Sequence, residues 1–86
     1  MSNTRICFVR HGETNWNAER RMQGHIDIPL NANGISQAER LANALIRVKH
    51  SFDVIYSSDL ERALHTANAV ASALSLDVQI TPRLRE

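Results

Sequence analysis

A histidine lies between an arginine and a glycine near the start of the chain, in the run Arg10-His11-Gly12-Glu13-Thr14. A histidine held at the end of a strand can bond one ring nitrogen to the backbone and attack with the other. Arg10 supplies a planar fork of donors that suits phosphate oxygens. Gly12 permits tight backbone geometry or the close approach of a ligand. These residue types predict attack by an imidazole on a phosphorylated substrate.

A second arginine, Arg62, is expected to join this group. It lies in the first turn of a predicted helix, where backbone N–H groups and the helix dipole also favour anions. The strand expected before that helix ends at the same edge of the sheet as His11. The two arginines and the histidine should therefore converge there. The alternative for Arg62 is an exposed helical arginine paired with Asp59 or Glu61.

Three short apolar runs predict the strands that position these residues. Residues 6–9 form an unbroken run that is typical of a buried strand in a parallel sheet. Residues 52–56 predict a second strand. Residues 76–80 alternate in polarity, which suits a half-exposed strand at a sheet edge.

Two amphipathic segments predict helices between the strands. The first is expected to start after Asn31, a plausible N-cap, and the second after a capping box made by Ser58 and Glu61. The order strand, helix, strand, helix, strand predicts an α/β sandwich with a mainly parallel sheet. One domain is expected, over residues 1–86.

The connection between the first strand and the first helix is unusually long. It covers residues 11–30, about twenty positions rich in polar side chains, whereas such connections usually take about 2–6 residues. Open α/β sheets place their ligands at the carboxyl ends of strands, where this segment begins. The function is therefore expected to lie in this loop.

Composition excludes several other classes of protein. The chain has 10 Lys and Arg against 9 Asp and Glu, intermixed, which argues against the sustained positive face of a nucleic-acid binder. No stretch reaches the roughly 20 apolar residues of a membrane span, and the N-terminus lacks a secretory apolar region, so a cytoplasmic location is expected. The single cysteine, Cys7, cannot form an internal disulfide, and its place in the first strand predicts an inert core thiol.

Three segments, in order, closely resemble the signatures of the histidine phosphatase superfamily, also called phosphoglycerate mutase-like. They are residues 8–14 with Trp16-Asn17, Gln23-Gly24, Asp27, Pro29-Leu30 and Gly34; residues 56–63 with Thr66-Ala67; and Arg83-Leu84-Arg85-Glu86. The family includes small-molecule phosphatases and cofactor-dependent mutases. The resemblance covers nearly the whole chain and implies a three-layer α/β/α sandwich, of which this chain holds a β-α-β-α-β portion.

The resemblance also implies roles for individual residues. His11 is the nucleophile that becomes phosphohistidine, Arg10 and Arg62 bind the transferring phosphoryl group, and Glu86 donates a proton to the leaving oxygen. No metal or other cofactor is implied, because arginines balance the phosphate charge. The implied substrate is a small phosphorylated metabolite.

Three loop residues, Asn17, Gln23 and Gly24, match the family's phosphate-binding positions. For Asn17 and Gln23 the alternative is a loop residue that makes a turn. Glu13 is expected to buttress the loop, and Trp16 to be a packing anchor.

The resemblance favours a phosphomonoester hydrolase, because residues 23–27 and 84–86 look more like the phosphatase branch. A cofactor-dependent phosphoglycerate mutase is the first alternative. The second is a catalytically incomplete fragment or phosphate-binding module, because the family continues past Glu86 and supplies a second active-site histidine. None of His25, His50 or His65 has the expected setting of that histidine, between glycines after a strand.

The same comparison with the family predicts open sheet edges. In the family's sheet, a strand from the later part of the domain lies between the first two strands of this chain. The chain is therefore expected to be a truncated portion of such a domain, with unpaired edges that favour association of copies or a swapped dimer.

Overall fold

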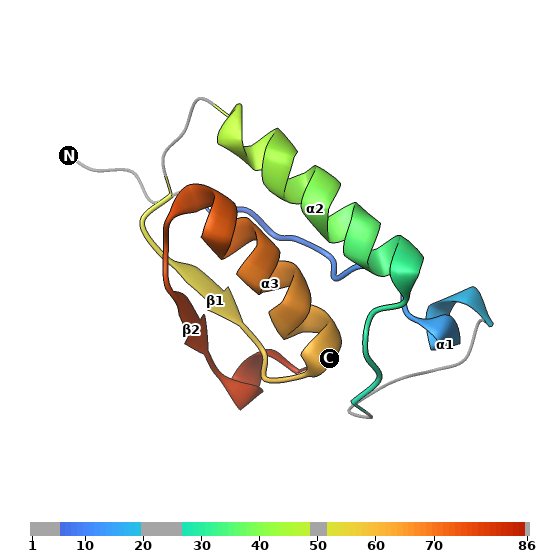
Figure 1. Ribbon diagram of the computed structural model, residues 1–86. Coiled ribbons are helices and arrows are strands. Elements are labelled where there is room, and N and C mark those ends of the chain that lie inside the picture. The colour runs from blue at the N-terminus through green and yellow to red at the C-terminus, as the bar shows by residue number, and fades with distance from the viewer. Residues whose placement is uncertain (1–5, 20–26, 49–51, 86) are drawn as a thin grey trace.

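The computed structural model describes residues 6–19, 27–48 and 52–85 (Figure 1). Its elements, in chain order, are α1 (Asn15–Ala18), α2 (Ala32–Ile46), β1 (Ile55–Ser57), α3 (Glu61–Leu74), β2 (Val78–Ile80) and the 3-10 turn η1 (Pro82–Leu84). The strands β1 and β2 pair in parallel, with Tyr56 opposite Gln79. The predicted α/β class with parallel pairing is confirmed.

The helix α2 begins where the sequence predicts. Asn31 is its N-cap, and the side-chain Oδ1 accepts a hydrogen bond from the backbone N–H of Gly34 at 2.8 Å. This bond satisfies one of the N–H groups that the first turn of a helix leaves without an internal partner. The start of the helix is therefore determined by residues that are neighbours in the sequence.

The helix α3 begins differently from the prediction. Leu60 is its N-cap and makes no side-chain cap bond, so the capping box of Ser58 and Glu61 is wrong. Instead, Oδ1 of Asp27 accepts a hydrogen bond from the backbone N–H of Glu61 at 2.6 Å. The chain is still extended at Leu60, which places Ser58 too early to cap, and a carboxylate from the 11–30 loop takes over that task.

The core lies where α2 and α3 pack together. Figure 1 shows the two helices side by side, with α3 over the pair of strands. Small side chains face this junction: Ala38 and Ala42 of α2 and Ala71 of α3 are buried. Small residues let two helix backbones approach closely, which compensates for the few large apolar side chains in this core.

The backbone of the 11–30 loop touches the first turn of α2. A Cβ atom placed on Gly34 would lie 2.7 Å from the backbone nitrogen of Glu13, and one placed on Gly12 would lie 2.9 Å from the Cα of Gly34. Real Cβ atoms do not come this close to backbone atoms. Both positions therefore need glycine because of close approach.

The first segment differs most from the prediction. Residues 6–9 belong to no strand and are exposed, with 72% of Ile6 and 92% of Phe8 accessible, so the predicted buried strand is wrong. Cys7 is exposed too, so it is not a core thiol. An apolar run becomes a buried strand only when another strand satisfies its backbone groups. Within the described residues, the ladder of β1 is shared only with β2.

Among the residues that the structure describes, no helix combines the length and the apolar character that crossing a membrane requires.

Replacing Gly34 by alanine should destabilise the fold by about 1–3 kcal/mol, because the added methyl group meets the backbone of Glu13. Elsewhere in a helix, replacing glycine by alanine stabilises by roughly 0.5–1 kcal/mol. A loss of stability would therefore identify the contact with the backbone of Glu13 as its cause. Urea unfolding followed by circular dichroism measures the change in the free energy of unfolding. Ser36→Ala, at an exposed position of the same helix, is the matched control and should leave stability equal or slightly higher. A stabilised G34A variant would contradict the close contact.

The exposed Phe8 should promote association between copies of the chain, because large apolar side chains in water favour contact with one another. Light scattering after size-exclusion chromatography should show an average mass that rises with protein concentration. Phe8→Ser should lower that mass more than Leu84→Ser, because Phe8 is larger and 92% exposed, against 52% for the leucine in η1. Equal masses for all three proteins would show that the first segment takes no part in association.

Candidate active site

The loop that starts at His11 is held together at its two described ends. Thr14 and Leu30 form an isolated antiparallel bridge, and the N–H of Asn31 donates to the carbonyl of Glu13 at 2.9 Å. Thr14 is fully buried and Leu30 nearly so. The two described ends of the loop therefore lie side by side, joined at residues 13–14 and 30–31, and these bonds fix the backbone near His11.

The imidazole of His11 has a defined orientation. Its Nδ1 lies 2.6 Å from the carbonyl oxygen of Gly12, and the side chain is half-buried. A carbonyl oxygen can only accept a hydrogen bond, so this contact requires the proton on Nδ1. In the neutral ring the lone pair then belongs to Nε2. This matches the expected arrangement of one ring nitrogen on the backbone.

Gly12 ties the His11 loop to α3. Its backbone N–H donates to Oγ1 of Thr66 at 3.1 Å, and that hydroxyl donates to the carbonyl of Arg62 at 2.9 Å. Thr66 is buried. Its anchoring role is absent from the expectations drawn from the sequence. The available signal is a threonine four residues after Arg62, a spacing at which a hydroxyl commonly bonds to the helix backbone.

Glu13 joins the same loop to α2. Its N–H donates to Oε1 of Gln37 at 2.8 Å, and its carboxylate accepts from Nδ2 of Asn31 at 2.9 Å. Nδ2 of Asn33 contributes a longer bond of 3.4 Å. The expected buttressing role of Glu13 is confirmed.

The two arginines lie in contrasting surroundings. Arg62 is fully buried in the first turn of α3, so its alternative as an exposed helical arginine is wrong. Arg10 is exposed and lines a pocket of about 400 Å³ together with His11, Gly12 and Thr66. Arg62 is not among the residues that line this pocket. The structure therefore places Arg10 and His11 at one pocket and connects Arg62 to them through Thr66.

Asn17 makes local contacts in the structure. Its Oδ1 accepts the N–H of Thr14 at 3.1 Å, and its own N–H donates to Oγ1 of Thr14 at 3.1 Å, which is a capping box for α1. The structure therefore shows Asn17 in the alternative role, as a loop residue that makes a turn. A contact between Asn17 and phosphate stays a prediction. Trp16, next to it, is half-buried.

Several candidate residues lie outside the described residues: Gln23, Gly24 and Glu86, and with them His25 and His50. Their roles stay predictions. His65 is described and lies exposed on α3.

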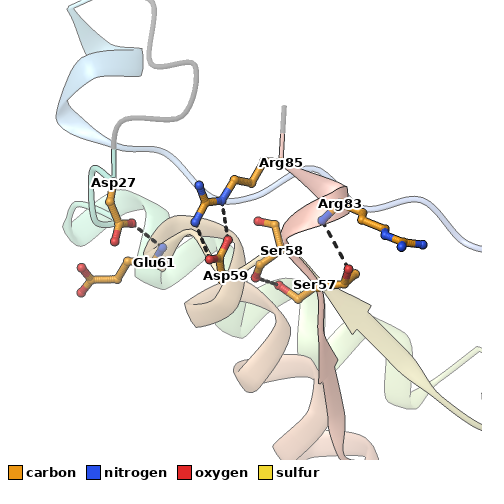
Figure 2. Close-up of polar contacts among 8 residues, drawn as sticks. Asp27, Ser57, Ser58, Asp59, Glu61, Arg83 and Arg85 are labelled. Atoms are coloured by element: carbon orange, nitrogen blue, oxygen red, sulfur yellow. Dashed lines mark hydrogen bonds and ion pairs between the residues drawn. The ribbon is translucent and has the colours of Figure 1, made fainter.

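Charged side chains from three segments meet at the start of α3 (Figure 2). Nε of Arg85 donates to Oδ1 of Asp59 at 2.6 Å, and its Nη2 donates to Oδ2 of the same carboxylate. Asp27 points at the Glu61 N–H beside this pair. The hydrogen bond to Asp59 raises the pKa of Arg85; desolvation opposes the shift, and the charges of Asp59 and Asp27 add to it.

The last turn is also tied to β1 by its backbone. The N–H of Thr81 donates to the carbonyl of Ser57 at 2.8 Å, which extends the parallel pairing by one bond beyond β2. Thr81 and Arg85 are thus both bonded to the segment that runs from the end of β1 into α3.

Within the described ranges, 6–19, 27–48 and 52–85, no three His, Cys, Asp or Glu side chains are grouped closely enough to hold a metal ion.

Known proteins share both the sequence and the fold of this chain. The phosphoglycerate mutase-like protein 4 of Arabidopsis thaliana is 48% identical over 82 residues, which is 94% of this chain and 35% of that protein. The adenosylcobalamin/α-ribazole phosphatase of Escherichia coli is also 48% identical, over 95% of this chain and 39% of the relative. This chain thus spans little more than a third of the length of these relatives.

Solved structures agree with these matches. A mycobacterial glucosyl-3-phosphoglycerate phosphatase in complex with VO3 superposes with a TM-score of 0.81 at 39% identity, over 88% of this chain and 35% of that one. A phosphoserine phosphatase from Entamoeba histolytica in complex with 3-phosphoglyceric acid gives a TM-score of 0.78 at 43% identity, over 88% and 36%. Residues 6–86 match the histidine phosphatase superfamily (branch 1), and the chain belongs to this family.

Proposed function

We propose that this chain carries the nucleophile of a phosphomonoester hydrolase that acts on a small phosphorylated metabolite through phosphohistidine at His11. The observation that carries the proposal is the contact of Nδ1 with the carbonyl of Gly12, because it leaves the lone pair on Nε2. A neutral imidazole with a fixed tautomer is the form that can attack phosphorus.

In the first step, Nε2 of His11 forms a bond to phosphorus while the bond between phosphorus and the ester oxygen breaks. Arg10 and Arg62 are proposed to bind the phosphoryl oxygens, which carry the negative charge. Glu86 is proposed to give its proton to the departing oxygen. In the second step, the same carboxylate takes a proton from water as the water oxygen attacks phosphorus and releases His11.

Relatives favour hydrolysis as the reaction. The names of the Escherichia coli, mycobacterial and Entamoeba relatives describe phosphatases of different phosphorylated metabolites. Because this chain matches little more than a third of each, the activity of a whole protein of that kind is a proposal here.

The test is the intact mass of the 86-residue chain after incubation with 4-nitrophenyl phosphate and a quench at neutral pH. A mass increase of one phosphoryl group, lost on brief acid treatment, is expected, because a phosphorus–nitrogen bond is labile in acid. His11→Ala should abolish the adduct. The matched control is His65→Ala, since that exposed histidine of α3 lies outside the proposed site.

Circular dichroism of the same samples shows whether each protein is folded. An adduct that persists in the folded His11→Ala protein would disprove the assignment of the nucleophile. A folded wild-type chain that binds phosphate or vanadate without forming an adduct would favour the phosphate-binding module instead.

Transfer to a second substrate hydroxyl is the other enzymatic candidate. It is favoured by a relative from Escherichia fergusonii, a probable phosphoglycerate mutase that is 47% identical over 94% of this chain and 37% of its own length. Phosphorus NMR of 3-phosphoglycerate incubated with the protein separates the two reactions. Hydrolysis gives inorganic phosphate, whereas a mutase gives 2-phosphoglycerate.

A further inference from the structure

We propose that Gln37 is a positioning residue for His11 and that it acts through the peptide group between Gly12 and Glu13. The proposal rests on the proposed function, because it concerns the nucleophile of that reaction. In this scheme Gln37 determines which ring nitrogen of His11 carries the proton, and it does not touch the phosphoryl group.

The peptide group between Gly12 and Glu13 has a partner on each side. Its carbonyl oxygen lies 2.6 Å from Nδ1 of His11, and its N–H donates to Oε1 of Gln37 at 2.8 Å. The peptide is planar and trans, so its C=O and N–H point in opposite directions. One rigid group is therefore held between the imidazole and the amide of Gln37.

The helix α2 brings Gln37 to this peptide. Gly34 lies three positions earlier, on the same face of the helix, and a Cβ atom placed there would lie 2.7 Å from the backbone nitrogen of Glu13. The absence of a side chain at Gly34 lets the loop backbone approach the helix closely enough for Gln37 to reach the N–H. Gln37 also lines the pocket of about 400 Å³ that contains His11.

The neighbouring attachments of the loop do not replace this bond. Thr66 accepts the N–H of Gly12, and the carbonyl of Glu13 accepts the N–H of Asn31, so these bonds hold the peptide groups before and after. A single peptide group can rotate between its two Cα atoms while its neighbours stay in place, and a glycine on one side offers little steric resistance. Such a rotation would turn the carbonyl away from the imidazole, and the bond to Gln37 opposes it.

The carbonyl of Gly12 matters for the chemistry because it selects the reactive form of the ring. With the proton on Nδ1 the lone pair is on Nε2, whereas the other tautomer has its lone pair on Nδ1, directed at the carbonyl. As Nε2 bonds to phosphorus, the ring becomes cationic and keeps its proton on Nδ1, so this hydrogen bond strengthens in the transition state. The bond from the peptide N–H to Gln37 polarises the carbonyl and makes it a better acceptor.

Folding alone gives little reason for the bond to Gln37. The side chain of Gln37 is exposed, so water can replace it as an acceptor without leaving a buried group unsatisfied. Glutamine and methionine also have similar helix propensities. Gln37→Met should therefore fold as the wild type does, with a nearly unchanged free energy of unfolding in urea.

The first measurement is nitrogen NMR of the histidine rings in the 86-residue chain, at alkaline pH, where imidazole rings are neutral. A ring nitrogen that carries a proton and one that carries a lone pair differ widely in chemical shift, and His11→Ala identifies the signals of His11. The wild type should carry the proton on Nδ1. Gln37→Met should lower the ratio of this tautomer to the other by about two- to tenfold, the range that one net hydrogen bond represents.

Two further variants separate the acceptor from other properties of the side chain. Gln37→Glu keeps an oxygen at the same reach and should keep the wild-type ratio of tautomers. Gln79→Met makes the same change at an exposed glutamine of β2 and should leave the ratio unchanged as well. An unchanged ratio in Gln37→Met, or an equal loss in Gln37→Glu, would overturn the proposal.

The second measurement is the rate of adduct formation at His11 with 4-nitrophenyl phosphate. Gln37→Met should slow it at least by the factor by which the population of the reactive tautomer falls, and Gln79→Met should not. A slower rate with unchanged tautomers would show that Gln37 acts on the substrate, which would overturn its role in positioning. A wild-type chain that forms no adduct would instead disprove the proposed function, while the NMR data would still decide whether Gln37 orients the ring.

Discussion

The buried hydrogen bond from the N–H of Gly12 to Oγ1 of Thr66 is the contact on which the site depends. It joins positions 54 residues apart in the sequence, and the same hydroxyl bonds back to the carbonyl of Arg62. A buried donor left without its acceptor costs about 1–3 kcal/mol, so the loop has a strong preference for this one place on α3. The position of the His11 backbone consequently follows from the packing of α2 against α3, since Glu13 is bonded to the first of these helices and Gly12 to the second.

Structural features that depend on residues close together in the sequence could be predicted. The start of α2 at Asn31 and the backbone contact of the His11 ring are of this kind. The parallel pairing of the later strands joins distant residues, but the alternation of strand and helix patterns indicates it. The failures at the start of α3 and in the first segment depend on residues far away in the chain that no pattern indicates. Asp27 caps α3 from a distance of 34 positions, which no local pattern reveals. The apolar run at residues 6–9 has the composition of a buried strand but lacks, among the described residues, a strand beside it, so Phe8 and Cys7 are exposed.

Arg62 lies between two attachments of one loop. The loop that starts at His11 reaches α3 first through Thr66 and later through Asp27, which accepts the N–H of Glu61. The sequence suggests that N–H groups at this helix end would favour an anionic ligand, but a protein carboxylate already holds one of them. An incoming phosphate would therefore meet the charge of Asp27 if it approached the helix end along its axis. Arg62, in the first turn of the helix, is itself fully buried and does not line the pocket at His11, so its described connection to His11 runs through Thr66 and Gly12.

The first segment changes from exposed to hydrogen-bonded at His11. The two proposed roles, attack by His11 and phosphate binding by Arg10, therefore fall in different surroundings. Residues 6–10 are exposed and belong to no strand, whereas residues 12–14 are bonded to α2, α3 and Leu30. His11, the proposed nucleophile, adjoins the bonded part, and Arg10 belongs to the exposed part. A polypeptide that paired with residues 6–10 would fix Arg10 but would leave the bond from His11 to Gly12 as it is. Orientation of the imidazole is therefore a property of the helices and the loop, whereas the proposed contact of Arg10 with a phosphoryl group would come from an exposed segment. Since an arginine contributes to binding only when it is held in place, attack by His11 and tight binding of phosphate need not arise together in this chain.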